Sequence, residues 1–453
     1  MPYDGQQAGK RGHADIIRNP DVAKFLEQCE YLRKPGDDAV GEIADLYQLA
    51  PKSDELPRLV VASDGSAYAQ AIDGEFPSTQ MGYVKLSLMA FDMKAYNGLI
   101  QPGNPFVEPF KVAEIHNSGR GVAFVLPGAN VRYKKQHVQD GFRLSIYEQL
   151  EDHRTKVHAQ APSIRDMLYH LQGGQIQIDR CPRCGEEGLF LFKQPAEHVI
   201  KCQNPACGTD VYVTDSLRIH EQISDQGDNA SAMTRFMNAV EHLQLAAVVK
   251  TMADNNLDAL CATAIMLDGP LALFGQPAKY HASIQKFYNS VFERCLTMGK
   301  KPPVIIGLQK DGMVMEHARS LERHLKPGTF CPITDEYRAK FINGIAPLTE
   351  NFGHETYYGQ DFIYKTDSGR IFDICLAYPF PDKQQRAIFA SKKADAAHYE
   401  PWLARAFALV RHLEFDLYEN AVVPVALAHR HASISLKPGG TLLDVLTKQH
   451  LDG

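Results

Sequence analysis

Two runs of apolar, β-type residues each lead into an Asp-Gly dipeptide. The first run precedes Asp64-Gly65, and the second precedes Asp268-Gly269, about two hundred positions later. A buried strand that ends in Asp-Gly holds a carboxylate at the rim of a sheet, and the glycine lets backbone or ligand approach closely. Two such carboxylates from different strands bind divalent metal well once the fold brings them together. The pattern predicts a metal site that suits phosphodiester hydrolysis.

Apolar spacing along the rest of the chain predicts helices and further strands. Helical periodicity covers 13–50, 143–173, 231–253, 279–297 and 399–418, and strand-type runs cover 81–90, 121–126 and 304–308. A hairpin is expected from 361–365 and 370–374, with the turn at 366–369. The run that leads to Asp64 and the runs 81–90 and 121–126 follow one another without predicted helices between them. These three strands therefore indicate an antiparallel meander. The mixture predicts an α/β fold with a partly antiparallel sheet.

Length and composition narrow the class of protein. With 453 residues, 44% of them hydrophobic, the chain can bury the core of one elaborated domain or of two. No apolar run reaches membrane-spanning length, and the polar start 1–6 does not have the pattern of a signal peptide. We therefore expect a cytoplasmic protein with no membrane partner.

The charge balance is mildly acidic. The 48 basic and 54 acidic residues give a net charge of −6, which argues against a protein that grips DNA alone through bulk electrostatics. Basic stretches at 132–135 and 300–301 are typical of solvated faces. A nucleic-acid substrate would therefore need a narrow groove or a partner that supplies affinity.

Four of the nine cysteines form the strongest local motif. The pairs Cys181/Cys184 and Cys202/Cys207 are separated by seventeen residues, a spacing typical of two knuckles that present four thiolates tetrahedrally. The runs 189–192 and 199–200 fit the two strands of a zinc ribbon. A site with four cysteine ligands has no open coordination position, so we predict structural Zn²⁺. The other cysteines are expected to be reduced core residues: Cys29, Cys261, Cys295, Cys331 and Cys375.

Each acidic or imidazole candidate is weak when it is considered alone. Asp64 and Asp268 have an ordinary strand-to-turn context. Glu241 lies at the edge of a helical apolar stripe, where glutamate is usually solvated, and His429 follows an apolar run, where a hydrogen-bonded core histidine is common.

Together, and in this order, the segments around these candidates resemble the NurA nuclease family. The similar segments are 61–66, 235–241, 266–271, 306–310 and 424–429. The resemblance implies an RNase H-like mixed sheet flanked by helices, and cleavage of DNA with Mn²⁺ or Mg²⁺. It also implies a homodimer that works with a HerA-type hexameric ATPase/translocase, in DNA end processing or anti-phage defence.

The resemblance also suggests a division of the chain. It runs from about 55 to 440 and is interrupted by a zinc-ribbon insertion that shorter members lack. We therefore predict an N-terminal helical extension over 1–54, a nuclease core in two parts over 55–175 and 216–453, and the inserted four-cysteine zinc ribbon over 176–215.

The chemistry of phosphodiester cleavage agrees with the implied site. The reaction needs an activated water and stabilisation of charge at phosphorus and at the leaving oxygen, which two divalent ions roughly 4 Å apart can supply. By hypothesis Asp64 bridges the ions, Asp268 completes one shell and Glu241 reaches in from a helix. His429 would ligate the second ion or act near the leaving group.

Three further polar residues near predicted strands have alternative interpretations. Lys310 follows a buried strand and either contacts the scissile phosphate or solvates the strand end. Asp335 fits an N-cap, because Thr334-Asp335 opens a predicted helix. Asp361 has no assigned role.

Other classes of function stay open or are disfavoured. One alternative is a non-catalytic zinc-ribbon adaptor in a nucleic-acid-processing complex, and another is an RNase H-like nuclease that acts on RNA or hybrids. The chain has no P-loop, so ATP-driven motion would come from a partner. It also has no Gly-x-Ser-x-Gly elbow, which disfavours a serine hydrolase.

Overall fold

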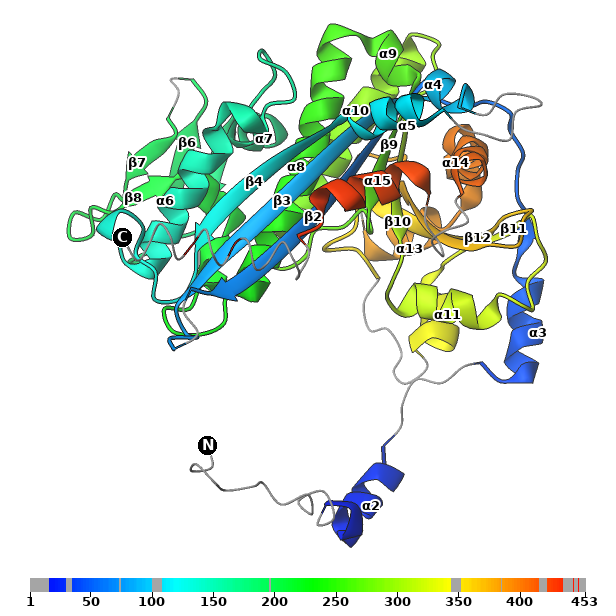
Figure 1. The fold of residues 1–453 in the computed structure, drawn as a ribbon, viewed down its shortest axis with the longest axis horizontal. Helices are drawn as coiled ribbons and strands as arrows, with labels where there is room; N and C mark the ends of the chain where they lie inside the picture. The colour runs from blue at the N-terminus through cyan, green and yellow to red at the C-terminus, as the bar shows by residue number, and fades with distance from the viewer. Residues whose placement is uncertain are drawn as a thin grey trace.

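A large mixed sheet forms the centre of the computed structural model (Figure 1). The structure describes residues 16–29, 35–72, 75–99, 108–194, 197–343, 352–383, 385–414 and 422–434, with Leu443 and Thr447. Within this part, the strands of the sheet are β1 (Gln48–Leu49), β2 (Leu59–Ala71), β3 (Gln80–Asp92), β4 (Gly119–Pro127), β9 (Thr263–Asp268), β10 (Val304–Gln309), β11 (Thr329–Pro332), β12 (Gly359–Lys365) and β13 (Ile371–Ala377). Their spatial order is β1-β11-β12-β13-β10-β9-β2-β3-β4.

The direction of the strands confirms the predicted fold class. Strands β2, β3 and β4 form an antiparallel meander, and β9 and β10 run parallel to β2. The order β4-β3-β2-β9-β10 is the RNase H-like sheet that the resemblance implies. Strands β13, β12 and β11 extend it with antiparallel pairing, and β12 and β13 form the expected hairpin.

The first apolar run does not end at its Asp-Gly dipeptide, contrary to the prediction. Strand β2 continues to Ala71 because β3 pairs with it along its whole length. Its pairing with β9, by contrast, stops at Ser63 opposite Leu267. Asp64 is therefore the first residue of β2 after its pairing with β9 ends. The second run does end as predicted, because Asp268 is the last residue of β9.

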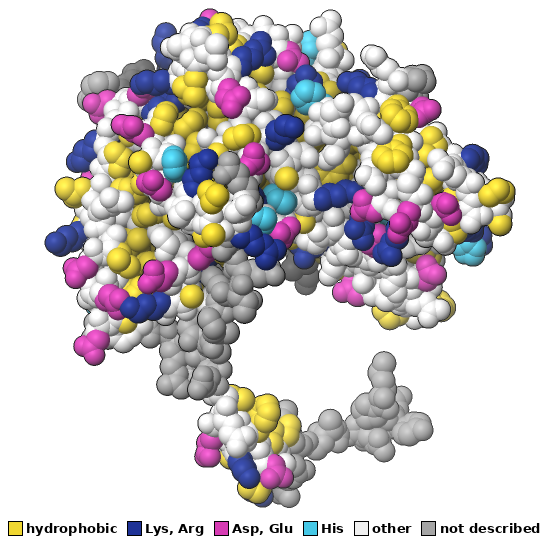
Figure 2. Space-filling view, turned by 180° about the vertical axis from the view of Figure 1, so that it is seen from behind, with side chains coloured by type: hydrophobic (Ala, Val, Ile, Leu, Met, Phe, Trp, Pro, Cys, Tyr) yellow, Lys and Arg dark blue, Asp and Glu magenta, His cyan; other side chains and the backbone are white. Residues whose placement is uncertain are grey.

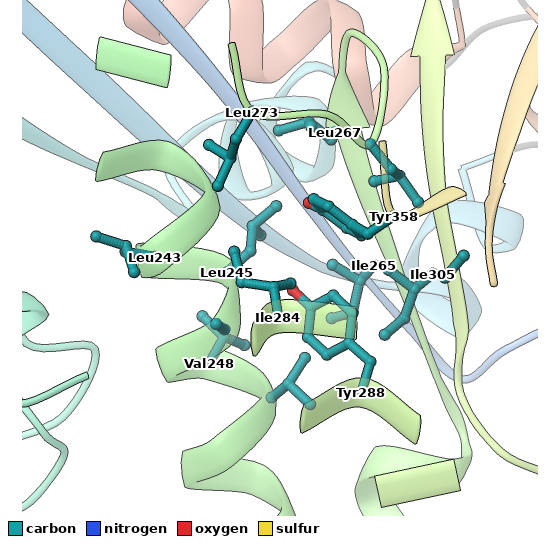
Figure 3. Packing of buried hydrophobic residues seen from close by; sticks show 14 of the residues in the cluster. Leu243, Leu245, Val248, Ile265, Leu267, Leu273, Ile284, Tyr288, Ile305 and Tyr358 are labelled. Carbon is teal, nitrogen blue, oxygen red and sulfur yellow. The ribbon is translucent and has the colours of Figure 1, made fainter. Parts of the chain in front are cut away.

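Two long helices cover one face of the sheet. Helix α8 (Ala230–Asn255) lies against β2 and β3. Helix α10 (Tyr280–Thr297) lies beside α8, and its Tyr288 packs against Ile265 of β9 and Ile305 of β10 in Figure 3. Helix α8 comes so close to β2 that a Cβ atom at Gly65 would lie 2.7 Å from Met237 Cγ. The glycine of the first Asp-Gly dipeptide thus serves helix packing.

Helices α14 (Glu400–Leu413) and α15 (Val423–Ala432) lie on the opposite face. The ring of Phe407 in α14 stacks on Tyr364 of β12 with centroids 4.3 Å apart. Helix α15 crosses β2 and β3 in front of the sheet in Figure 1. Its residue His431 lies against Gly119 of β4. The sheet is thus enclosed between two helical layers.

The remaining α-helices are short or lie outside these two layers. They are α2 (Pro20–Glu27), α3 (Asp37–Asp45), α4 (Met93–Asn97), α5 (Pro109–His116), α6 (Val138–Glu151), α7 (Ile164–Leu171), α9 (Leu257–Cys261), α11 (Met313–Leu321), α12 (Asp335–Tyr337) and α13 (Arg386–Lys393). Among the described residues, no helix combines the length and the apolar character needed to cross a bilayer.

Two predicted helical stretches are divided in the structure. The stretch 143–173 contains α6 and α7, because Ser163 and Asp166 form a capping box that starts a new helix. The stretch 13–50 contains α2 and α3, and its residues 13–15 and 30–34 lie outside the described residues, as do 415–418 of the stretch 399–418. Helix α2 stands apart from the sheet in Figure 1 and buries none of its residues.

Strand β4 forms one edge of the sheet, and a side chain covers part of that edge. Gln149 of α6 accepts a hydrogen bond from the Val125 N–H at 3.0 Å and donates one to the Val125 carbonyl at 2.7 Å. The amide thereby satisfies both backbone groups that Val125 turns away from β3.

The cysteine-rich segment contains two separate hairpins. Strand β6 (Leu189–Phe192) pairs with β5 (Gln175–Ile178), and β7 (Val199–Lys201) pairs with β8 (Asp210–Tyr212). The runs predicted as the two strands of one ribbon therefore belong to different hairpins, which corrects that detail. Buried Leu189, Leu191 and Val211 join the same hydrophobic core as the main sheet. The proposed domain boundaries stay a prediction.

Candidate metal centres

Asp64, Asp268 and His429 come together at the rim of the sheet. One ligand atom from each lies within 4.8 Å of the others. His429 Nδ1 is 2.8 Å from Asp64 Oδ2 and 3.8 Å from Asp268 Oδ2. The carboxylate side chains are only 8% and 12% exposed, whereas the imidazole is 60% exposed. The cluster is therefore buried on its carboxylate side and open on its histidine side.

Three elements position these groups. Asp64 directly follows the last residue of β2 that pairs with β9, and Asp268 ends β9 itself, so the two carboxylates meet at one edge. The turn after Asp268 needs Gly269, whose φ is 131°. Helix α15 lies over β2 on the same face and brings His429 to Asp64. The three predicted residues thus converge from segments far apart in the chain.

The buried carboxylate of Asp64 is held next to the carboxylate of Asp268. Burial, and then the negative charge of Asp268, raise the pKa of Asp64 to about 6, while His429 and Lys310 act in the opposite direction. Like charges at close range disfavour ionisation of both groups. A divalent cation would relieve this repulsion, and perturbed carboxyl groups in such a place are candidates for a functional site.

Lys310 is a member of this cluster. Its Nζ donates to Asp268 Oδ2 at 2.5 Å. Its backbone carbonyl accepts a hydrogen bond from Arg319 Nη2 of α11, also at 2.5 Å. The sequence offered a phosphate contact or a solvated strand end for Lys310, and the structure adds an ion pair with a candidate metal ligand.

Glu241 lies close to the cluster but on the other side of the sheet. Its Oε1 accepts a hydrogen bond from Ser63 Oγ at 3.1 Å, and successive residues of a strand point to opposite faces, so Ser63 and Asp64 diverge. Glu241 is 4% exposed, which excludes the solvated flank considered from sequence. Burial, with the charges of Asp64 and Asp268, raises the pKa of Glu241 well above its usual range.

A second group of buried polar residues lies behind Lys310. Gln309 Nε2 donates to Asp361 Oδ1 at 3.1 Å and to Asp373 Oδ2 at 2.7 Å. Arg338 forms an ion pair with Asp361. Sequence reasoning noticed Asp361 without assigning it and missed Asp373. The antiparallel register of the predicted hairpin 361–374, set beside the strand that ends at Gln309, was the signal that could have joined them.

Asp335 does not cap its helix. Thr334 is the N-cap of α12, and its side chain accepts a hydrogen bond from the Tyr337 N–H at 2.9 Å. Asp335 instead pairs at 2.5 Å with Lys393, whose side chain is buried. The helix start was predicted correctly, but the adjacent threonine performs the capping.

The four predicted cysteine ligands also converge. Their Sγ atoms all lie within 4.8 Å of one another, with Cys181 and Cys207 at 3.9 Å and Cys184 and Cys202 at 3.5 Å. A tetrahedral zinc site with Zn–S bonds of about 2.3 Å places sulfur atoms about 3.8 Å apart. The arrangement fits a four-cysteine zinc ion.

The remaining cysteines are free, and most are in the core. Cys295, Cys331 and Cys375 are buried and Cys261 is half-buried, as expected. Cys29 is exposed, which corrects its prediction as a core residue. It follows α2, the helix that buries none of its residues.

Two solved structures are similar to this chain over nearly their whole length. Similarity covers 98% of this chain and 96% of the crystal structure of the NurA nuclease from Sulfolobus solfataricus, with 8% identity and a TM-score of 0.38. A second crystal structure, of NurA, is matched over 97% of this chain and 96% of that one, with 10% identity and a TM-score of 0.29. No family model and no curated protein matches the chain.

Proposed function

We propose that this chain is a divalent-metal-dependent nuclease that hydrolyses phosphodiester bonds in DNA by a two-metal-ion mechanism. The observation that carries the proposal is the convergence of Asp64, Asp268 and His429 within 4.8 Å at the sheet rim. We further propose that it acts in the cytoplasm as a homodimer, coupled to a HerA-type hexameric ATPase/translocase in DNA end processing or anti-phage defence.

The donor set supports a hard divalent cation. Carboxylate oxygens with one imidazole nitrogen suit Mn²⁺ and also accept Mg²⁺. The raised pKa of Asp64 reflects its burial and then the negative charge of Asp268, and bound cations would offset both by stabilising the ionised carboxylate. When bound, such ions activate water and stabilise the charge that develops on a phosphodiester.

The protein's own groups have separate parts in this proposal. Asp64 and Asp268 hold the cations, and the exposed imidazole of His429 either adds a ligand or exchanges protons near the leaving oxygen. Glu241 is proposed as a further ligand from the α8 face. Because its raised pKa favours the protonated carboxyl, it binds a cation only after losing that proton.

The test is cleavage of end-labelled linear duplex DNA with Mn²⁺, with and without the cognate ATPase. We expect Asp64→Asn and Asp268→Asn each to lower the cleavage rate by about a thousandfold or more, as removal of a central catalytic group does. Asp254→Asn, on an exposed ion pair of α8, is the matched control and should cleave like the wild type. Undiminished cleavage by Asp64→Asn would overturn the proposal.

Two other outcomes separate the alternatives. Wild-type protein that is inert even with the ATPase present would favour the adaptor. Preferential cleavage of RNA or of an RNA–DNA hybrid, lost in Asp64→Asn, would keep the site and change the substrate.

A further inference from the structure

The ammonium group of Lys310 binds an oxygen atom of Asp268 that is a candidate metal ligand. Asp268 Oδ2 accepts the 2.5 Å hydrogen bond from Lys310 Nζ, and the same atom lies 3.8 Å from His429 Nδ1. The side chains of the pair are only 25% and 12% exposed. Such a partly desolvated ion pair is stronger than a pair on the open surface.

The backbone of Lys310 is held in place by neighbouring side chains. Arg319 binds the carbonyl of Lys310, and the preceding residue Gln309 is anchored by two buried carboxyl groups. Asp361 and Asp373 supply those groups and are 2% and 0% exposed. The flexible four-carbon stem of lysine can therefore move its charge without moving the strand.

We propose that Lys310 is a built-in competitor of the metal, an inference that rests on the proposed function. In the metal-free protein the ammonium neutralises Asp268 and so limits repulsion with Asp64. A divalent cation at Asp268 takes that lone pair, and the released ammonium then meets the phosphate backbone of the nucleic acid. Lys310 thus has two positions, one on the carboxylate and one on the substrate.

This exchange couples the two ligands. Metal binding frees a cation for phosphate, and phosphate holds that cation away from Asp268. Each ligand therefore strengthens the binding of the other by the same factor, as linkage requires. A lysine that only solvates the strand end would give no such coupling.

The test measures Mn²⁺ affinity by calorimetry on metal-stripped protein, without any cleavage reaction. Lys310→Met keeps the length of the side chain and removes its charge, and we expect it to bind Mn²⁺ about 3- to 30-fold more tightly. Lys310→Arg keeps the cation and should stay within about threefold of the wild type. Lys301→Met, which removes an exposed partner of Glu55, is the control and should not change the affinity.

A second measurement examines the coupling itself. Binding of a 20-nucleotide phosphorothioate oligonucleotide is followed by fluorescence anisotropy with and without Mn²⁺. We expect Mn²⁺ to strengthen binding to Lys310→Met less than it strengthens binding to the wild type. A thermal melt of each variant confirms that it is folded.

The outcomes distinguish this inference from the proposed function. Mn²⁺ affinity of Lys310→Met equal to or weaker than that of the wild type, with Mn²⁺ binding lost in Asp64→Asn, would overturn the inference alone. No Mn²⁺ binding by wild-type protein would overturn both.

Discussion

The two candidate metal centres are assembled in opposite ways. The first and last of the four cysteines, Cys181 and Cys207, are only 26 positions apart, whereas His429 and Asp64 are 365 positions apart. The cysteine cluster is complete in itself and has no vacant direction. The carboxylate cluster is open on its histidine side and already contains the ammonium of Lys310. We therefore expect the first centre to hold a segment together and the second to exchange the cation at its carboxylates.

The two clusters also differ in how much they stabilise the surrounding fold when no metal is bound. Four thiols offer little stabilisation to one another, so we expect the fold around them to depend on a bound zinc ion. The carboxylates keep partners of their own in His429 and Lys310, so their part of the fold persists without one.

The largest effect is expected at the cysteine cluster. Cys202→Ser should release the bound zinc, measured by elemental analysis, and should lower the free energy of unfolding by several kcal/mol, because a structural zinc ion contributes its binding energy to folding. Cys29→Ser, outside the cluster and exposed, is the control and should keep both zinc and stability. Retained stability in Cys202→Ser would mean that the segment does not depend on the ion.

Asp64→Asn should change the free energy of unfolding in the opposite direction. In protein stripped of metal it should raise the free energy of unfolding by about 1–2 kcal/mol, because a carboxylate whose pKa is raised to about 6 by burial and by Asp268 is costly to keep ionised. Urea unfolding at pH 7.5 measures this, with Asp254→Asn as the control. A destabilised Asp64→Asn would show that the bond to His429 outweighs the repulsion.

Asp373→Asn probes the layer behind the carboxylate site through pH. Burial, and then the charge of Asp361, raise the pKa of Asp373 well above its usual range. Above about pH 4 the unfolded chain loses a proton that the folded protein keeps, so this group lowers stability as the pH rises. We expect the variant to gain about 1 kcal/mol at pH 8 relative to pH 4, by urea unfolding. Equal differences at both pH values would contradict the protonated state.

The smallest effect is expected at Ser63. Its hydroxyl donates to Glu241 and lowers the pKa of that carboxyl, against burial. Ser63→Ala should cost about 1 kcal/mol of stability and weaken Mn²⁺ binding severalfold if Glu241 binds the ion. Stability that falls while Mn²⁺ affinity stays constant would restrict Glu241 to a structural role.

The contrast between the centres also explains what could be predicted from sequence. Cysteine knuckles are local, so their spacing was sufficient to name all four residues. Asp64, Asp268 and His429 were joined only through their order along the chain, since no local signal relates strands so far apart. The alternation of β2 carried the fact that Ser63 and Asp64 face opposite ways, but which face α8 would cover depends on packing that spacing does not encode.

Strand boundaries show the same limit. Residues 59–63 predicted a strand, but its continuation to Ala71 follows from pairing with β3, a long-range contact. The ion pair of Lys310 with Asp268 likewise depends on β9 and β10 lying side by side in parallel register. Apolar periodicity identified most elements, and tertiary pairing decided where they end and which charges meet.

The side chain of Gln149, which extends from α6 to the edge strand β4, affects how copies of this protein can associate. An open strand edge is a template on which another chain can add its own strand. At Val125 that template is blocked, since the amide already takes both the outward donor and the outward acceptor. Continuation of the sheet from one molecule into the next would have to displace a glutamine that mimics a peptide unit. The Gln149 side chain therefore opposes the addition of a further strand at Val125.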